Sequence, residues 1–197
     1  MPLKIQRAVL DLIAQVTGGT FETRTPEWLN RPGMCECGGH WQLVSKIYRK
    51  LTDSDLPETM PPREWRKLDG ILKCANSSPR IVEVDESQHF NRYRGMTLRL
   101  YPAESPLAFD RKTWIEHSQA EPRQKSGSWA SPRPPLFPAA GGRHLQRAFR
   151  DMLADLLPPD YGFLPTLRIA HFEVTDWIGA ECAQGKMKDL LARKFSD

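Results

Sequence analysis

The chain has 197 residues, a length that predicts one domain, or one domain that carries a long insertion. Apolar residues make up 40% of the sequence and charged residues 26%, which suits a globular core and excludes wholesale disorder. No segment approaches the roughly 20 apolar residues of a membrane helix, and residues 1–19 lack the apolar stretch of a secretion signal, so we expect a soluble, cytoplasmic protein with no membrane partner. The net charge of +4 is too small to identify a polyanionic partner by itself.

The spacing of apolar residues predicts both helices and strands along the chain. In chain order the predicted elements are a helix at 3–16, a helix at 41–51, strands at 68–72 and 80–85, a strand at 97–101, a short helix at 111–118, a helix at 143–157, a strand at 166–175 and a helix at 177–195. The two strands at 68–72 and 80–85 are separated by turn-forming residues and predict a hairpin.

Residues 119–142 are rich in Pro, Gly, Ser and Ala and predict an inserted loop, which is either inert or folds onto nucleic acid or a protein partner. We therefore expect a core made of residues 41–95 and 143–197, preceded by a helix and loop at 1–40 and interrupted by an insertion at 96–142. From Glu121 to Arg150 there are six basic residues and one acidic residue, an excess that suits phosphate groups. Further basic residues bracket the hairpin: Lys46, Arg49, Lys50, Arg63, Arg66 and Lys67.

The hairpin carries acidic residues, which strands normally avoid. Glu83 and Asp85 are two residues apart, so both carboxylates leave the same face of a strand, about 7 Å apart along it. Val82 and Val84 then face the other way. One face of the predicted strand is acidic and the other is apolar.

The turn decides whether Asp69 joins these acids. Residues directly opposite each other in a hairpin share a face, so Asp69 meets Glu83 if the hairpin centres on Asn76, or Asp85 if it centres on Ser77. A two-residue loop would scatter the acids over both faces unless a bulge restored the register. We therefore predict an odd-numbered or bulged loop.

Clustered carboxylates raise one another's pKa values unless a cation lies among them. Mg²⁺ prefers oxygen ligands, commonly one or two carboxylates with water and substrate phosphate. The acids therefore indicate a hard divalent ion, and the alternative is a set of solvated acids at a sheet edge.

Residues 80–90 read R-I-V-E-V-D-E-S-Q-H-F and end with an amide, an imidazole and an aromatic ring beside the acids. This run resembles the strand-and-turn signature of the PD-(D/E)XK nuclease superfamily, particularly its branch similar to very-short-patch-repair endonucleases. Two later runs, R-A-F-R-D-M-L-A-D-L-L and L-R-I-A-H-F-E-V, are similar to the helix and strand that follow in that branch. The resemblance covers roughly residues 41–95 and 143–180, and it implies a restriction-endonuclease-like α/β (α+β) core with a mixed sheet of about four strands flanked by helices.

The resemblance also implies roles for the acids. Asp69 would be the first aspartate of the superfamily, Glu83 its second acid, and Asp85 stands in place of the usual lysine. Asp69, Glu83 and Asp85, with the carbonyl of Val84, would hold Mg²⁺ or Mn²⁺. Relatives often have a glutamate or glutamine on the preceding helix, where Gln42 is the match.

His89 follows the acids and titrates near neutrality, so it is the candidate to take over water activation from the missing lysine. The alternative for His89 is a capped histidine or one satisfied in the core. Gln88 would orient the attacking water or contact a phosphate oxygen.

Lys73, Arg92 and Arg94 are candidates to contact phosphates of a nucleic acid, and Tyr93 to stack on a base. An ordinary solvated face is the alternative for each of them. A homodimer or a protein partner would use the insertion or the C-terminal helix.

Cys35, Cys37 and His40, with Cys74 as a fourth residue, have the side chains that a structural zinc site uses. The C-x-C spacing is tighter than usual, and incidental reduced thiols are the favoured alternative.

Three functions are compatible with these observations. The first is a metal-dependent endonuclease that acts on nucleic acid, most simply DNA, in repair or defence. The second is a nuclease-derived binding module without catalysis, which the missing lysine and the crowding by Glu86 suggest. A glycoside hydrolase that uses the acid pair is the third, although the basic surroundings suit phosphate better than a neutral sugar.

Overall fold

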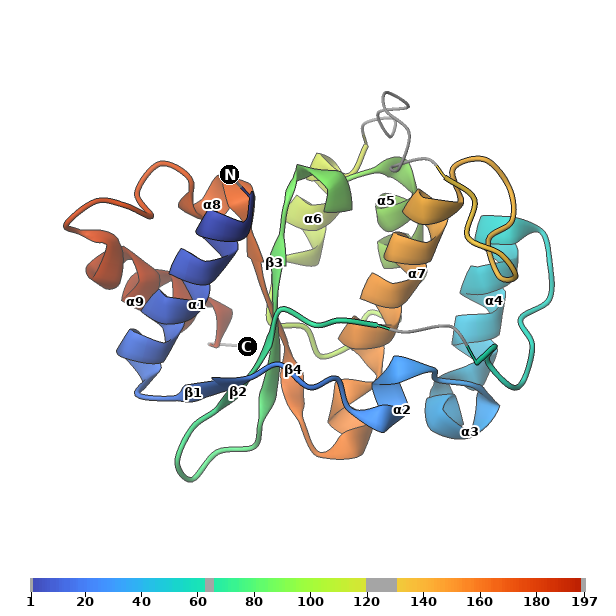
Figure 1. Cartoon of the computed structure of the whole chain (residues 1–197), viewed down its shortest axis with the longest axis horizontal. Coiled ribbons are helices and arrows are strands. Elements are labelled where there is room, and N and C mark those ends of the chain that lie inside the picture. The colour runs from blue at the N-terminus through green and yellow to red at the C-terminus, as the bar shows by residue number, and fades with distance from the viewer. Residues whose placement is uncertain (1, 63–65, 120–130, 196–197) are drawn as a thin grey trace.

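The computed structural model describes residues 2–62, 66–119 and 131–195 and is a mixed α/β fold (Figure 1). Its elements are α1 (Pro2–Thr17), β1 (Thr20–Glu22), α2 (Glu27–Asn30), α3 (Met34–Cys37), η1 (Gly38–His40), α4 (Trp41–Thr52), β2 (Gly70–Lys73), β3 (Arg80–Asp85), η2 (Ser87–His89), α5 (Arg92–Arg99), α6 (Arg111–His117), α7 (Gly142–Leu156), η3 (Pro158–Tyr161), β4 (Leu164–Ala170), α8 (His171–Val174) and α9 (Ala183–Lys194). No helix in these ranges is long and apolar enough to cross a membrane.

Four strands form one sheet in the order β1-β2-β3-β4. β1 and β3 pair antiparallel with β2, whereas β4 runs parallel to β3. The predicted mixed sheet of about four strands flanked by helices is confirmed. Only β1 escaped prediction, because three residues are too few for an alternating pattern to emerge.

The β2–β3 hairpin has the odd register that the sequence predicts. Gly70 pairs with Val82 and Leu72 with Arg80, which leaves residues 73–79 between the last pair, centred on Asn76. Asn76 takes a left-handed conformation (φ 59°), which asparagine tolerates better than most residues. Continued by one residue, this register sets Asp69 opposite Glu83.

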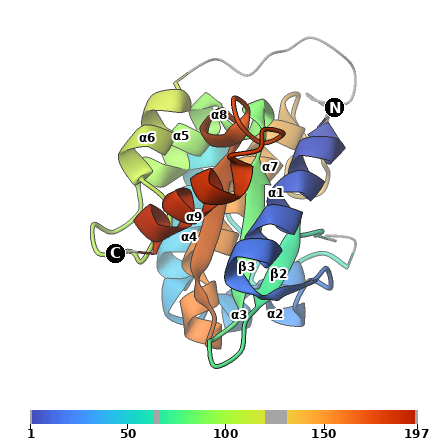
Figure 2. The same cartoon turned by 90° about the vertical axis from the view of Figure 1, so that its left-hand side faces the viewer.

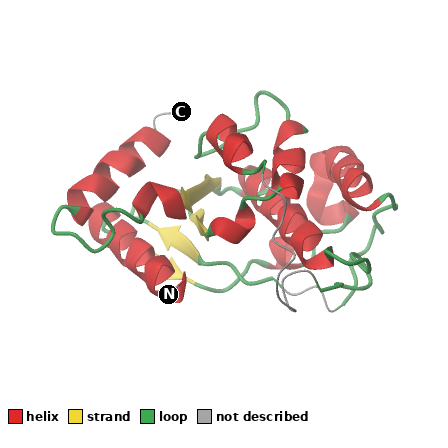
Figure 3. Cartoon of the chain, turned by 90° about the horizontal axis from the view of Figure 1, so that it is seen from above, coloured by secondary structure: helices red, strands yellow, loops and turns green. Residues whose placement is uncertain are grey.

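Helices cover both faces of the sheet, as the views from the side and from above show (Figures 2 and 3). On one face, Val82 and Val84 pack in a buried cluster with residues of α1 and α9, such as Ile13 and Met187. On the other face lie α4, α5, α6 and α7 (Figure 1). The alternation along β3 therefore directs its acidic residues toward the α7 side.

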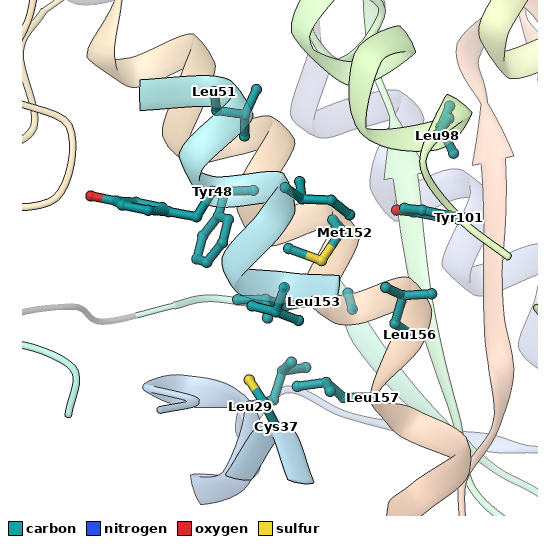
Figure 4. Packing of buried hydrophobic residues seen from close by; sticks show 14 of the residues in the cluster. Leu29, Cys37, Tyr48, Leu51, Leu98, Tyr101, Met152, Leu153, Leu156 and Leu157 are labelled. Carbon is teal, nitrogen blue, oxygen red and sulfur yellow. The ribbon is translucent and has the colours of Figure 1, made fainter. Parts of the chain in front are cut away.

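The larger core lies between this second face and the helices. In Figure 4, Tyr48 and Leu51 of α4 lie beside Met152 and Leu153 of α7, and all four side chains are buried. The stripe of apolar residues predicted for residues 143–157 is therefore the packing face of α7. The Tyr48 hydroxyl donates a hydrogen bond of 2.6 Å to the carbonyl of Leu136.

Three expected elements differ in the structure. Residues 97–101, expected as a strand, lie mostly in α5, because the Asn91 side chain accepts hydrogen bonds from the backbone N–H groups of Tyr93 and Arg94 and caps a helix there. The strand expected at 166–175 ends at Ala170, and the C-terminal helix begins at Ala183. The helix expected at 111–118 is confirmed as α6.

Two parts of the sequence that carry predictions lie outside the described residues. They are Arg63, one of the basic residues before the hairpin, and residues 120–130 of the expected insertion loop. The end of that loop is part of the core, because Leu136 and Phe137 are buried among the residues of α4 and α7. The burial of these two residues could not be predicted from composition, since two apolar residues within a proline-rich segment show no helical or strand periodicity.

Candidate active site

A cleft of about 370 Å³ lies between the β2–β3 hairpin and α7. Residues from α1, the segment before β2, β3, η2 and α7 line it. The charged and histidine side chains among them are Asp69, Glu83, Glu86 and Asp151, which are acidic, Arg66, Lys67, Arg143, Arg147 and Arg150, which are basic, and His89. The cleft thus combines an acidic sheet edge with a basic helix face.

Asp69 and Glu83 are the acids that the hairpin register brings together. The Asp69 carboxylate accepts hydrogen bonds of 2.8 Å from the backbone N–H of Val84 and from the side-chain amide of Gln6. Glu83 is 7% exposed, and its Oε1 accepts a hydrogen bond of 3.1 Å from the guanidinium of Arg66. Both carboxylates are therefore held in place by groups on neighbouring elements.

Burial changes the proton affinity of both acids. Burial raises the pKa of Asp69, although the hydrogen bond from Val84 opposes the shift. Burial also raises the pKa of Glu83 to about 7, more than the cation of Arg66 lowers it. The two acids are desolvated without full compensation, so this end of the cleft favours protons or a cation.

The Asp69–Glu83 pair fits a hard divalent ion that uses few protein ligands. Each carboxylate oxygen can accept more than one hydrogen bond or metal contact, so the bonds to Val84, Gln6 and Arg66 leave acceptor sites. Mg²⁺ commonly takes one or two carboxylates and completes its shell with water and phosphate. Within residues 2–62, 66–119 and 131–195, no group of three or more His, Cys, Asp or Glu side chains has the arrangement of a full protein cage.

Asp85 does not take the place that the sequence predicts for it. It shares a face of β3 with Glu83, but it is completely buried and does not line the cleft. Its Oδ1 is 2.7 Å from the guanidinium of Arg168 on β4, and its Oδ2 accepts a hydrogen bond of 2.8 Å from the indole N–H of Trp114. Because Arg168 and Trp114 occupy the carboxylate, the predicted set of three metal ligands reduces to two.

His89 lines the cleft with its ring held by an acid from α7. Its Nδ1 is 3.0 Å from Oδ2 of Asp151 and 3.5 Å from Oδ1 of Asp85. Burial lowers the pKa of His89, but the two aspartates outweigh burial and raise it above its ordinary value. The side chain forms part of the cleft wall, and its Nδ1 is satisfied by the buried acids behind it.

Asp151 lines the cleft at a position that the sequence patterns did not predict. Burial raises its pKa, but His89 and Arg168 together hold the pKa well below the ordinary value, so the carboxylate is charged. The available signal was an acid within the apolar stripe of α7, four residues before a second one, Asp155. Acids at buried helical positions normally have a partner.

Gln88 also lines the cleft, as expected. Its amide Nε2 donates a hydrogen bond of 2.6 Å to Glu86, and its Oε1 is buried with no hydrogen-bond partner among the described residues. Glu86 therefore orients the side-chain amide of Gln88 within the cleft.

A buried ionic network lies behind His89 and includes Arg94, which the sequence suggested as a phosphate contact. Arg94 is completely buried, with its guanidinium 2.7 Å from Asp155 and 2.9 Å from the hydroxyl of Tyr101. Arg168 also contacts Asp155, at 2.6 Å. The predicted role of Arg94 is therefore wrong, because this buried arginine has no access to a phosphate group.

The remaining predicted nucleic-acid contacts, and Gln42 as the expected site residue of the preceding helix, lie elsewhere among the described residues. Lys73 is at the far end of β2 and forms an ion pair with Glu22. Arg92 is exposed with its guanidinium 4.9 Å from the ring centre of Tyr93. Gln42 lines a separate groove on α4. None of these four side chains is among those that line the cleft in the described part of the chain.

The cations of the cleft wall come from positions that the sequence analysis noted only as basic. Arg143, Arg147 and Arg150 lie on one face of α7, and Arg66 and Lys67 precede β2. For the three arginines of α7, the spacing in the sequence was the usable signal, because positions three and four apart on a helix share a face.

The candidate zinc residues do not form a common site among the described residues. Cys37 is buried, its thiol lies 3.7 Å from the carbonyl of Pro32, and burial raises its pKa to about 12. Cys35 is exposed, and His40 lies 3.4 Å from Asp160.

The fold and the cleft define a mixed α/β protein with a carboxylate pair, half-buried Asp69 and buried Glu83, in a basic cleft. The profile of a family described as "Family of unknown function (DUF7255)" matches residues 46–193, and the chain belongs to this family. Searches of curated proteins and of solved structures each found no match. The matched segment contains the hairpin, α5 and α7, and therefore most of the cleft.

Proposed function

We propose that the protein is a metal-dependent nuclease that hydrolyses phosphodiester bonds in nucleic acid, most simply DNA. The observation that carries this proposal is the register of the hairpin, which sets Asp69 opposite Glu83 in a cleft with five basic side chains. The mixed four-stranded sheet flanked by helices is what the resemblance to PD-(D/E)XK nucleases implies, and Asp69 directly before β2 and Glu83 on β3 support the proposal.

Asp69 and Glu83 would hold Mg²⁺ or Mn²⁺, and a bound ion would polarise the scissile phosphate and lower the pKa of a coordinated water. The raised pKa values of both acids support this assignment, since a divalent cation favours their charged forms. The arginines of α7 bind and orient the phosphates that flank the bond to be broken.

His89 acts as a hydrogen-bond donor and general acid rather than as the water-activating base suggested by the sequence. Its raised pKa favours the imidazolium, and Asp151 engages its Nδ1, so Nε2 carries the proton that is passed to the leaving oxygen. Asp151 is a positioning residue, because it fixes the ring and stabilises its positive charge.

The test is cleavage of plasmid and of single-stranded DNA in Mg²⁺ or Mn²⁺ by the wild type and by Asp69→Asn and Glu83→Gln. Both variants should lose cleavage and should also lose the heat of Mn²⁺ binding in calorimetry. Asp189→Asn, which removes a charge from an exposed position on α9, serves as the control. Undiminished cleavage by Asp69→Asn and Glu83→Gln would defeat the proposal.

The alternative is a binding module of the same fold without catalysis. It is favoured by Asp85, which stands where the superfamily has lysine and is neutralised by Arg168. A binding module would retain nucleic acid in chelator, would cleave nothing, and would show no Mn²⁺ heat that depends on Asp69.

A further inference from the structure

We infer that the cleft receives a single, unpaired strand of nucleic acid whose phosphates follow the arginine face of α7. This inference rests on the site of the proposed function, but it concerns binding and does not require cleavage. It is carried by the spacing of the arginines of α7, by Lys67 on the facing wall and by the burial of Glu83 in the cleft.

The arginines of α7 have a regular spacing. Arg143, Arg147 and Arg150 lie on one face of the helix, and with a rise of about 1.5 Å per residue they are spaced about 6 Å and 4.5 Å apart along its axis. Neighbouring phosphates of a strand have a comparable separation. The guanidinium of Arg143 is 3.2 Å from the side-chain oxygen of Gln146, and that of Arg147 is 3.5 Å from the carbonyl of Gln88, so both lie along the cleft wall.

A cation also stands on the wall that faces α7. Lys67 comes from the segment before β2 and is exposed, whereas the side chain of Arg66 is 4% exposed and joins Glu83 to the backbone carbonyl of Arg150 at the base of the cleft. A strand in the cleft has the arginines of α7 on one side, Lys67 on the other and the acid pair below it. This is the arrangement of a groove that tracks a backbone.

The depth of the acid pair argues against a duplex. The acids lie in a cleft of about 370 Å³. Glu83 is only 7% exposed at the base of this space. Because a paired backbone is part of a rigid cylinder, a phosphate reaches the acids most readily when its strand is unpaired or splayed.

The cleft offers little for reading bases. Apart from His89, none of its described lining residues is aromatic. Base stacking therefore contributes little within the cleft, and affinity should come mainly from phosphates. Such binding tolerates any sequence and weakens steeply with salt.

The experiment measures fluorescence anisotropy in EDTA with the full chain and labelled 12-nucleotide oligo-dT, 12-nucleotide oligo-U and a hairpin duplex. We expect both single strands to bind at least tenfold more tightly than the duplex. Arg143→Gln/Arg150→Gln should weaken single-strand binding at least tenfold and make the slope of log K against log salt shallower by about 1.4, at about 0.7 per lost phosphate contact.

A matched control is Lys186→Gln/Lys188→Gln, which removes two exposed charges from α9 on the other face of the sheet. This control should leave the salt slope unchanged. Equal or tighter binding of the duplex, no binding of either single strand, or equal losses in the α7 and α9 variants would each overturn the inference. Circular dichroism confirms that both variants are folded, and Arg147→Gln alone tests the same face if the double variant is not.

The binding and cleavage tests separate the two proposals. If the wild type binds single strands through α7 in EDTA but cleaves nothing in Mn²⁺, the nuclease proposal fails and the strand inference stands. If it cleaves in Mn²⁺ with dependence on Asp69 but prefers duplex, the strand inference fails and the nuclease proposal stands.

Discussion

Replacing Glu83 by glutamine should change the free energy of unfolding, relative to wild type, more favourably at pH 8 than at pH 4. This holds although the substitution removes a charged partner of Arg66. Burial raises the pKa of Glu83 from its ordinary 4.5 to about 7. Between these values the folded protein keeps a proton that the unfolded chain releases, so the free energy of unfolding falls as the pH rises. At about 1.4 kcal/mol per pH unit, this difference in pKa corresponds to about 3 kcal/mol at pH 8 and to almost nothing at pH 4.

The assay is urea unfolding in EDTA at both pH values for wild type and Glu83→Gln. The effect of the variant at pH 8 minus its effect at pH 4 isolates the charge, because packing and the hydrogen bond to Arg66 are common to both measurements. Glu116→Gln, at an exposed position of α6, controls for the loss of one negative charge. If Glu83→Gln costs the same free energy at both pH values, burial does not perturb this carboxylate, and the electrostatic account of the acid pair fails.

Three further predictions concern the core and the ionic network. Asp155→Asn should cost about 3–5 kcal/mol in guanidinium unfolding, because it removes a charged partner from two buried arginines, Arg94 and Arg168, and a cost below 1 kcal/mol would contradict this. Met152→Ala, at a fully buried position of α7, should cost about 2–5 kcal/mol in the same assay, whereas an unchanged midpoint would show that the site is loosely packed. Asp151→Asn should lower the pKa of His89, followed by NMR of the ring protons, because the ion pair that raises it is lost; an unchanged pKa would exclude Asp151 as the positioning residue.

Local patterns predicted the hairpin and its acids well. The odd loop followed from the need to bring Asp69 beside Glu83, and the register confirms it around Asn76. The apolar stripe of α7 was equally legible, since a helix packed on one face keeps a 3.6-residue period. Where a short side-chain cap decides the outcome, as Asn91 does at the start of α5, a segment that resembles a strand becomes a helix.

The partners of the charged residues were harder to predict. Asp85 and Glu83 have the same sequence environment, yet Asp85 lies beside Ala170 of β4, and Arg168 reaches it, whereas Glu83 faces the cleft. Which acid is neutralised depends on the parallel pairing of β3 with a strand some eighty residues later. Hairpin spacing contains no information about that pairing, so the local sequence predicts the same metal-ligand role for both acids.

The same long-range pairing connects the buried network to the chemistry proposed for the cleft. The groups of this network are three acids, two arginines and one histidine: Asp85, Asp151, Asp155, Arg94, Arg168 and His89. Without the histidine proton they carry one excess negative charge in a space where charge is poorly solvated, so protonation of His89 balances them. Arg168 belongs to β4 and Arg94 to α5, and neither lines the cleft. Their positive charges nevertheless neutralise part of the negative charge of the three aspartates, and the negative charge that remains favours the protonated form of His89. The protonation of His89, which lines the cleft together with Asp151, is therefore a property of the assembled core. This explains how the proposed proton donor can persist beside two aspartates and the Asp69–Glu83 pair.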